Sequence, residues 1–227
     1  EKKKIVIKLG GSFLFDKGPN IKYLRDLADL MKTLYKNYSI TVIVGAGSTA
    51  RNYILAAREL GANESYYDLI GIDTSRLNAR LFISALGNMA YKEPCRNFED
   101  IVIAESSGKI VVMGGLVPGQ STDAVAAEVA EYIGADKLVI AKDVDYIYSD
   151  DPRKNPDAKR LEKMTREDLV ELVSKSRMRA KDYSVIDLVA AQIIYRAKFS
   201  TVVVNGRGVK NIESAVLGKK FVGTEIV

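Results

Sequence analysis

Short continuous runs of apolar residues alternate along the chain with longer stretches in which apolar residues recur every three or four positions. The continuous runs predict strands that are buried on both faces, and the longer spacing predicts amphipathic helices. Strands are expected at 5–9, 40–44, 110–113, 137–141, 201–205 and 223–227. Helices are expected at 23–37, 50–60, 66–90, 98–105, 124–134, 165–173, 185–197 and 211–217.

This order of elements predicts an α/β fold. Strands that alternate with helices form a mostly parallel sheet covered on both faces, a three-layer α/β/α sandwich whose ligand site lies outside the carboxyl ends of the strands. The length of 227 residues suits one large domain. The charged segment 142–159 contains two prolines and predicts a loop with a small hairpin, and the polar segment 174–184 is expected to be mobile.

Three of the predicted strands end in glycine-rich turns, at 10–12, 45–49 and 114–119. A strand that passes through such a turn into a helix presents free backbone N–H groups and the positive helix end to an anion, of which phosphate is the obvious example. Lys8 and Arg51 flank two of these turns. We therefore expect a shared crevice in which the turns and the two basic residues surround a phosphate.

Composition removes several classes of function. The 34 basic and 29 acidic residues are spread along the whole chain, so the net charge of +5 does not predict a nucleic-acid partner. A single cysteine, Cys95, and the absence of histidine exclude disulfide frameworks, zinc sites and histidine-based acid–base catalysis. No apolar run approaches the roughly 18 residues of a membrane span. We expect a cytoplasmic protein without membrane partners.

Two of the glycine turns nearly match known nucleotide motifs. Residues 45–50 fit the G-x-G-x-x-G/A dinucleotide fingerprint, but another helix follows where the fingerprint requires a strand ending in an acidic residue. Residues 114–121 have the spacing of a P-loop, but Gln120 stands where the phosphate-binding lysine belongs. Both a nicotinamide-dependent oxidoreductase and a P-loop enzyme are therefore disfavoured.

The motifs as a group resemble the amino acid kinase family and, within it, the archaeal-type UMP kinases. The run Pro118–Ala124 is the most discriminating of them, and the correspondence extends over essentially the whole chain. The matching residues are Gly10-Gly11-Ser12; Val44-Gly45-Ala46-Gly47 with Ala50-Arg51 and Tyr53; Gly71 with Arg76-Leu77-Asn78-Ala79; Gly114-Gly115 with Pro118-Gly119-Gln120-Ser121-Thr122-Asp123-Ala124; Val144-Asp145 with Ile147-Tyr148 and Asp151-Pro152; and Val185-Ile186-Asp187 with Ala190-Ala191.

The resemblance implies ATP-dependent phosphoryl transfer to UMP, with residues 1–135 binding the acceptor and residues 136–227 binding ATP. The implied catalytic residues are Lys8, Arg51, Asp143 and Asp187. The implied ATP-binding residues are Lys8, Leu9, Gly10, Gly11, Ser12, Gly47, Arg51, Lys142, Tyr148 and Asp151. The implied UMP-binding residues are Ala46, Asp68, Leu116, Val117, Pro118, Gly119, Gln120, Ser121 and Thr122.

The resemblance also implies a homohexamer built from dimers, for which the apolar-rich stretch 66–90 is the expected dimer face. No carboxylate cluster in the sequence demands a permanent metal, so Mg²⁺ is expected to arrive on the phosphates of ATP. Phosphoryl transfer requires alignment and charge neutralisation rather than proton transfer, which suits a site without histidine.

Two alternatives stay open at this point. The first is another small-molecule kinase of the same fold, acting on a phosphate or carboxylate acceptor; the isopentenyl phosphate kinases are disfavoured because they rely on a histidine. The second is a degenerate nucleotide-binding regulatory protein. It is motivated by Ala46, Lys142 and Tyr146, which stand where the family usually has a glycine, a small hydroxyl residue and a glycine.

Overall fold

The computed structural model describes residues 2–178 and 185–227 and is built around one seven-stranded sheet with the order β3-β2-β1-β4-β8-β9-β7. Neighbouring strands are parallel except for the antiparallel pair β8 and β9. The strands are β1 Lys3–Leu9, β2 Tyr38–Val44, β3 Val111–Met113, β4 Lys137–Lys142, β7 Lys163–Met164, β8 Ser200–Asn205 and β9 Gly223–Ile226. A separate antiparallel hairpin joins β5 Ile147–Tyr148 to β6 Arg160–Leu161.

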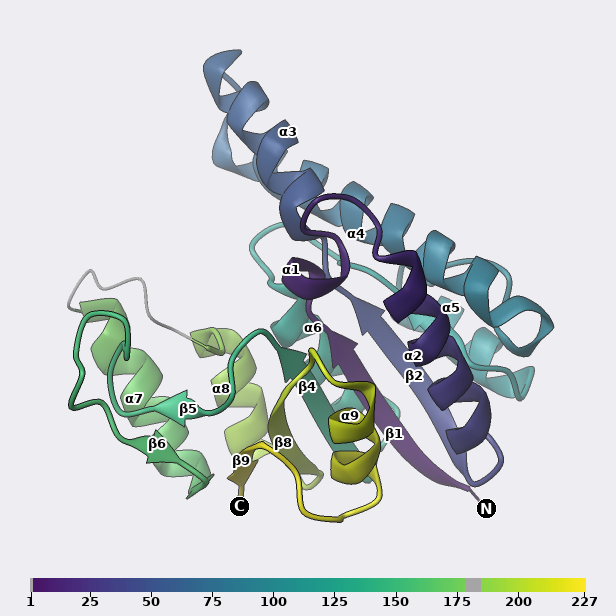
Figure 1. The fold of residues 1–227 in the computed structure, drawn as a ribbon. Helices are drawn as coiled ribbons and strands as arrows, with labels where there is room; N and C mark the ends of the chain where they lie inside the picture. The colour runs from purple at the N-terminus through teal and green to yellow at the C-terminus, as the bar shows by residue number, and fades with distance from the viewer. Residues whose placement is uncertain (1, 179–184) are drawn as a thin grey trace.

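Helices cover both faces of this sheet, and Figure 1 shows α2 and α9 in front of it and α6 behind it. The helices are α1 Gly11–Leu14, α2 Ile21–Leu34, α3 Gly47–Glu59, α4 Glu64–Leu86, α5 Phe98–Ser106, α6 Thr122–Tyr132, α7 Arg166–Met178, α8 Leu188–Arg196 and α9 Val209–Val216. Helix α3 and the beginning of α4 extend beyond the sheet at the carboxyl ends of its parallel strands (Figure 1). The predicted fold class, a three-layer α/β/α sandwich, is confirmed.

The core consists of two apolar clusters, one on each face of the sheet. In β1, Ile5, Ile7 and Leu9 belong to the cluster that includes α2, α4 and α9, whereas Val6 belongs to the cluster that includes α6 and α8. Successive side chains of a strand point to opposite faces, so Lys8 follows Val6 onto the α6 face. This alternation is what directs a charged side chain from an otherwise apolar strand toward the beginning of α6.

Several element boundaries differ from the sequence-based prediction. Helix α3 begins at Gly47 rather than at residue 50, and α4 ends at Leu86, followed by a 3₁₀ turn at Gly87–Met89. Helix α7 continues to Met178, so residues 174–178 are helical, while the rest of the segment predicted to be mobile, 179–184, lies outside the described residues. Helix α8 begins at Leu188 because the Asp187 side chain accepts a hydrogen bond from the Ala190 N–H and caps it.

Candidate active site at the carboxyl ends of the strands

The first two glycine turns pack directly against each other. A Cβ atom added to Gly11 would lie 2.2 Å from the backbone nitrogen of Gly47, and one added to Gly45 would lie 2.7 Å from the nitrogen of Gly11. A real Cβ atom essentially never lies within 3.0 Å of a heavy atom outside its own residue and chain neighbours. Glycine is therefore required at both positions by the close approach of the two backbones.

Helix α4 connects the second and third glycine turns. The Asn78 side-chain amide donates hydrogen bonds to the carbonyl oxygens of Gly45, at 3.0 Å, and Ala46, at 2.9 Å. Three residues earlier on the helix, the Ser75 hydroxyl accepts a hydrogen bond from the Gly115 N–H at 2.7 Å. The three turns predicted to share a crevice thus lie next to one another at the same end of the sheet.

Ala46, which departs from the expected glycine, fits its turn without strain. Its backbone angles are φ −79° and ψ −33°, in the right-handed helical region open to every residue. The left-handed conformation of this turn is taken instead by Gly47, with φ +72°. The alanine is therefore compatible with an intact turn at the N-terminus of α3.

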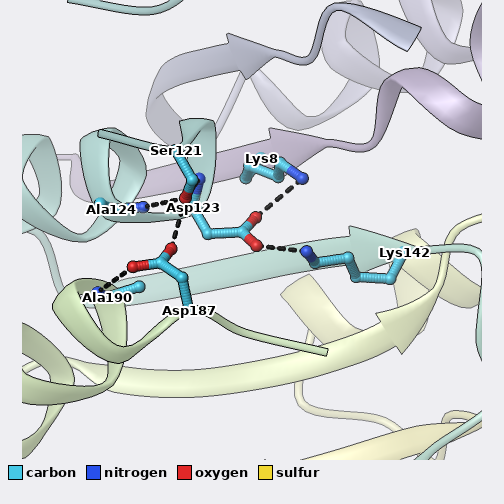
Figure 2. A network of polar contacts seen from close by, with 7 residues as sticks. All are labelled: Lys8, Ser121, Asp123, Ala124, Lys142, Asp187 and Ala190. Atoms are coloured by element: carbon cyan, nitrogen blue, oxygen red, sulfur yellow. Dashed lines mark hydrogen bonds and ion pairs between the residues drawn. The ribbon is translucent and has the colours of Figure 1, made fainter. Parts of the chain in front are cut away.

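A buried cluster of three charged residues lies where β1, β4 and α6 meet. The Lys8 ammonium is 2.7 Å from Oδ1 of Asp123, and the Lys142 ammonium pairs with Oδ2 of the same carboxylate. The Lys8 and Asp123 side chains are each 6% exposed, and that of Lys142 is 21% exposed. Figure 2 shows the two ammonium groups approaching the carboxylate, Lys8 from β1 and Lys142 from β4.

The charges of this cluster shift the pKa values of its members in ways that follow from burial and pairing. Burial lowers the pKa of Lys8 to about 8; the Asp123 carboxylate opposes this decrease and the Lys142 ammonium adds to it. Burial alone would raise the pKa of Asp123, but the Lys142 and Lys8 ammonium groups outweigh burial and lower it to about 2. At neutral pH the cluster holds two positive charges and one negative charge, which favours an additional anion.

Asp187 lies on the other side of the α6 N-terminus. Its carboxylate accepts a hydrogen bond from the Ser121 hydroxyl, which in turn caps α6 by accepting from the N–H groups of Asp123, at 3.0 Å, and Ala124, at 3.1 Å (Figure 2). Asp187 therefore connects the N-terminus of α8, which it caps, to the N-terminus of α6. This arrangement fixes the turn that carries Asp123.

A cavity of about 590 Å³, which we call the hairpin cavity, lies beside the cluster. Lys142 reaches it from the end of β4, Ser12 from the first glycine turn and Tyr148 from the β5–β6 hairpin. Its lining residues are Ser12, Lys142, Asp143, Val144, Asp145, Tyr148, Pro152, Arg153, Val185, Asn205 and Arg207. This volume is in the range of cavities that bind small molecules and cofactors.

Within the hairpin cavity, Asp143 is paired with Arg207. The guanidinium donates from Nε to Oδ1 of Asp143 and from Nη2 to Oδ2 at 2.8 Å, a bidentate contact that fixes the orientation of both groups. Arg207 belongs to the loop after β8, whereas Asp143 follows β4. The pair therefore joins two loops across the cavity wall, and the side-chain hydrogen bond to Asp143 raises the pKa of Arg207.

A second cavity, which we call the α4 cavity, has a volume of about 200 Å³. It is lined by Ala46, Ile54, Tyr67, Asp68, Gly71, Ile72, Ser75, Gly115, Gln120 and Thr122. Asp68 is exposed, and its carboxylate accepts a hydrogen bond from the Gly119 N–H at 2.7 Å. This bond holds the third glycine turn at Gly119, whose φ of +83° is left-handed. Thr122, which precedes Asp123, lines this cavity, whereas Lys142 lines the hairpin cavity. The cluster thus contributes Lys142 to one cavity, and the residue before Asp123 lines the other.

The structure does not bring every predicted residue to a cavity wall. Arg51 is exposed in the second turn of α3, because the helix begins at Gly47, and it has no ion-pair partner among the described residues. Asp151 is only 2% exposed, and its carboxylate accepts hydrogen bonds from the Arg153 backbone and side chain, so its neighbours line the hairpin cavity in its place. Leu9, Gly10 and Gly11 form the first turn, and Leu116 is buried while Val117 and Pro118 are exposed in the third.

Sequence reasoning missed Asp123 as the partner of both lysines, and it missed Arg207, Asn205 and Arg153 in the hairpin cavity. Asp123 lay inside the most discriminating motif, but neither lysine is close to it in sequence. Arg207 follows the strand 200–205 and precedes Gly208. A basic residue in a glycine-containing turn after a parallel strand was the available signal for it.

The described residues offer no dedicated metal site. Among residues 2–178 and 185–227, no group of three or more Asp, Glu, Cys or His side chains is arranged to hold a metal ion. The carboxylates of the cluster and of the cavity walls already accept hydrogen bonds or ion pairs: Asp123 from two lysines, Asp143 from Arg207, Asp145 from Asn205, Asp187 from Ser121 and Asp68 from the Gly119 N–H. No helix in the same residues has the length and apolar character needed to cross a membrane.

Comparison with known proteins gives consistent matches over nearly the whole chain. The model of the amino acid kinase family matches residues 3–205. A uridylate kinase from Methanococcoides burtonii is 46% identical over 213 residues, which cover 94% of this chain and 91% of that protein. A uridylate kinase from Methanobrevibacter smithii is 42% identical over 224 residues, 99% of each chain.

A solved structure leads to the same family as the sequence matches. The crystal structure of uridylate kinase from Archaeoglobus fulgidus superimposes with a TM-score of 0.89 at 41% identity, covering 99% of this chain and all of that one. The fold, which the superposition compares, and the sequence matches therefore identify the same family. The chain belongs to the amino acid kinase family.

Proposed function

We propose that this protein transfers the γ-phosphoryl group of ATP to UMP and produces UDP and ADP. The observation that carries the proposal is the identity of 42% over 99% of the chain with a relative that is named a uridylate kinase. The geometry is compatible with it: Lys142 of the positively charged cluster lines the larger cavity, and Thr122, which precedes Asp123, lines the smaller one, so both ligands would lie close to the cluster.

In this proposal ATP occupies the hairpin cavity. Its phosphates would lie against the backbone N–H groups of Gly11, Ser12 and Gly47, with Lys142 and Arg207 as the neighbouring cations, and Tyr148 would contact the rest of the nucleotide. The Gly10 N–H already donates to the Ala141 carbonyl oxygen at 2.9 Å, so Gly10 would contribute only through the shape of the turn. Asp143 would act mainly through Arg207, whose orientation it fixes. Arg51 and Asp151, which lie outside the cavity walls, stay as predicted ATP ligands on the strength of the family resemblance.

UMP would occupy the α4 cavity, with Asp68 toward the ribose and Thr122 toward the base. The segment 116–122 would surround the nucleotide, and Ala46 would contribute backbone contacts. Mg²⁺ bound to the ATP phosphates would neutralise part of their charge, and the engaged carboxylates described above are consistent with its arrival on the nucleotide. Lys8 would stabilise the charge that develops during transfer, and Asp187 would hold the α6 N-terminus and Asp123 in place.

The acceptor is best identified by a panel of phosphoryl acceptors. ADP release should be measured with ATP and Mg²⁺ in the presence of UMP, other nucleoside monophosphates, and phosphate or carboxylate acceptors. UMP is expected to give the highest kcat/KM. Preference for another acceptor would favour the related small-molecule kinase, and ATP binding without turnover on any acceptor would favour the regulatory protein.

The role proposed for Asp68 predicts discrimination between UMP and dUMP. A carboxylate beside the ribose hydroxyls loses a hydrogen-bond partner when the 2′-hydroxyl is absent, so UMP should be preferred by about ten- to a hundredfold in kcat/KM. In Asp68→Ala this preference should shrink, as measured by kcat/KM for both nucleotides.

Asp68→Asn is the matched control, because its amide oxygen can still accept from the Gly119 N–H while the second oxygen is replaced by a donor. If Asp68→Ala loses the preference for UMP over dUMP and Asp68→Asn keeps it in full, the effect comes from the turn at Gly119. An unchanged UMP to dUMP ratio in both variants would show that Asp68 does not contact the sugar.

We further propose that the protein works in the cytoplasm as a homohexamer built from dimers. The support is the family resemblance together with large apolar side chains exposed on α4, where Tyr66 is 58%, Leu69 is 44% and Leu77 is 63% exposed. Light scattering at micromolar concentration should give six times the chain mass of 25.0 kDa. A monomer mass would contradict the assembly without affecting the proposed reaction.

A further inference from the structure

A third cavity, of about 620 Å³, lies away from the two cavities described above. We call it the C-terminal groove. It runs along β9, past the segment 218–221 between α9 and β9, to the β5–β6 hairpin. Figure 1 shows the segment that connects α9 to β9 at the end of the sheet opposite the loops of the candidate active site. Its charged lining residues are Lys137, Arg160, Lys219, Lys220, Glu162 and Glu225.

The charges of the C-terminal groove favour an anion. Four of its side chains are positive and two are negative. Glu162 already pairs with Arg160 at 3.0 Å, and Glu225 lies 3.9 Å from Lys163. In the part of the chain that the structure describes, neither Lys219 nor Lys220 has a carboxylate partner. The lysines of the connecting segment are therefore available to a ligand.

Lys137 is held in a fixed position at one end of the groove. Its ammonium donates hydrogen bonds to the carbonyl oxygens of Ala215, at 3.0 Å, and Val216, at 3.4 Å, at the end of α9. An ammonium group has three N–H donors, so one remains for a ligand. The groove thus combines an ordered cation with two exposed ones in the connecting segment.

Aromatic rings connect the groove to the hairpin cavity. Tyr146 lines the groove, and its ring contacts that of Tyr148 edge to face, with centroids 6.5 Å apart. Tyr148 lines the hairpin cavity. The Arg160 guanidinium lies 5.5 Å from the centre of the Tyr146 ring. A ligand that engages Arg160 would therefore contact the same small hairpin that forms one wall of the nucleotide cavity.

We propose that the C-terminal groove is an additional binding site, for a ligand that carries a triphosphate group. Lys137, Lys219 and Lys220 bind the phosphates, and Arg160 joins them from the hairpin. Phosphate oxygens suit these side chains because charge-assisted hydrogen bonds from lysine and arginine are among the strongest polar contacts. The groove is also large enough for a nucleotide, so the phosphates come either from an inorganic polyphosphate or from a nucleoside triphosphate.

Equilibrium binding of inorganic triphosphate tests the site, with ADP and UMP present at saturating concentration to occupy the active site. The native protein is expected to bind triphosphate, and Lys219→Gln/Lys220→Gln should bind it about tenfold more weakly. The matched control is Lys198→Gln/Lys210→Gln, which removes two exposed lysines outside the groove and should leave the affinity within about twofold of native, because only screened long-range charge is lost. Absence of binding, or equal weakening in both variants, would overturn the proposal.

A non-hydrolysable ATP analogue identifies the source of the phosphates. Two molecules of AMP-PNP per native chain and one per Lys219→Gln/Lys220→Gln chain would assign the groove to a nucleotide. One per chain in both, with triphosphate still bound to the native protein, would assign it to an inorganic polyphosphate. Neither measurement depends on phosphoryl transfer, so a failed acceptor assay and a failed groove assay give separate answers.

Discussion

Replacement of Lys8 by alanine is expected to lower kcat by about 10²-fold or more while the KM for UMP changes little. The ammonium lies in a water-poor cluster, where a positive charge acts more strongly than at the surface on the charge that redistributes during transfer. The fold should survive, because Asp123 keeps its pair with Lys142. Steady-state kinetics with ATP and UMP varied separately would measure both quantities.

Lys4→Ala is the matched control, since it removes a lysine that pairs with Glu105 at 3.1 Å and lies near the end of β1 opposite the first glycine turn. Lys4→Ala should keep kcat within about twofold of the native value, because a partly exposed ion pair contributes little.

The pKa of about 8 for Lys8 also predicts that kcat falls as the pH rises through that value, because the deprotonated amine carries no charge. Nearly full kcat in Lys8→Ala would show that Lys8 takes no part in transfer.

Asp123→Asn should be the most destabilising of the substitutions considered and should also abolish most of the activity. The neutral amide would leave two ammonium groups without their shared counter-ion, and breaking a buried ion pair in this way costs about 3–5 kcal/mol. Loss of the fixed positions of Lys8 and Lys142 should lower kcat as well. Urea unfolding at neutral pH would give the change in the free energy of unfolding.

The pH dependence of stability provides a second signature of Asp123. Its pKa of about 2 in the folded protein lies below the value of about 3.9 for an unperturbed aspartate. The stabilisation is therefore fully present above about pH 4 and is lost as the pH falls toward 2. Asp123→Asn should lack this contribution, whereas Asp29→Asn, which removes an exposed partner of Lys32, should behave like the native protein. Equal stability of native and Asp123→Asn proteins at neutral pH would contradict the account.

The elements of the fold could be predicted because their apolar patterns are strong. The runs at β1 and β4 are apolar on both faces, and α2 carries an apolar stripe from Leu24 to Leu34 that packs on the sheet. Three of the short elements lack such patterns. Helix α1 has four residues, which is too short for a helical period to be read, and β6 and β7 have two each, so their pairing depends on neighbouring strands that local sequence does not specify.

The glycine turns and Lys8 were predicted from the sequence, but the ion pairs that the charged side chains of the site form were not. The alternation of β1 places Lys8 on the α6 face, which a sequence-based reading could have derived. That Lys142 would reach the same carboxylate depends on β1 and β4 being neighbours with parallel register, in which Lys8 stands opposite Ile140. The contact of Asp143 with Arg207 likewise depends on β4 and β8 being adjacent.

We expect this chain to phosphorylate UMP beside the Lys8–Asp123–Lys142 cluster. The most direct measurement is ³¹P NMR of the products formed from ATP, Mg²⁺ and UMP by the native protein and by Lys8→Ala. We expect UDP and ADP to appear in equal amounts with the native protein, and both rates to fall by about 10²-fold or more in the variant. ADP formation that is independent of UMP, or UDP formation at the same rate in both proteins, would contradict the claim.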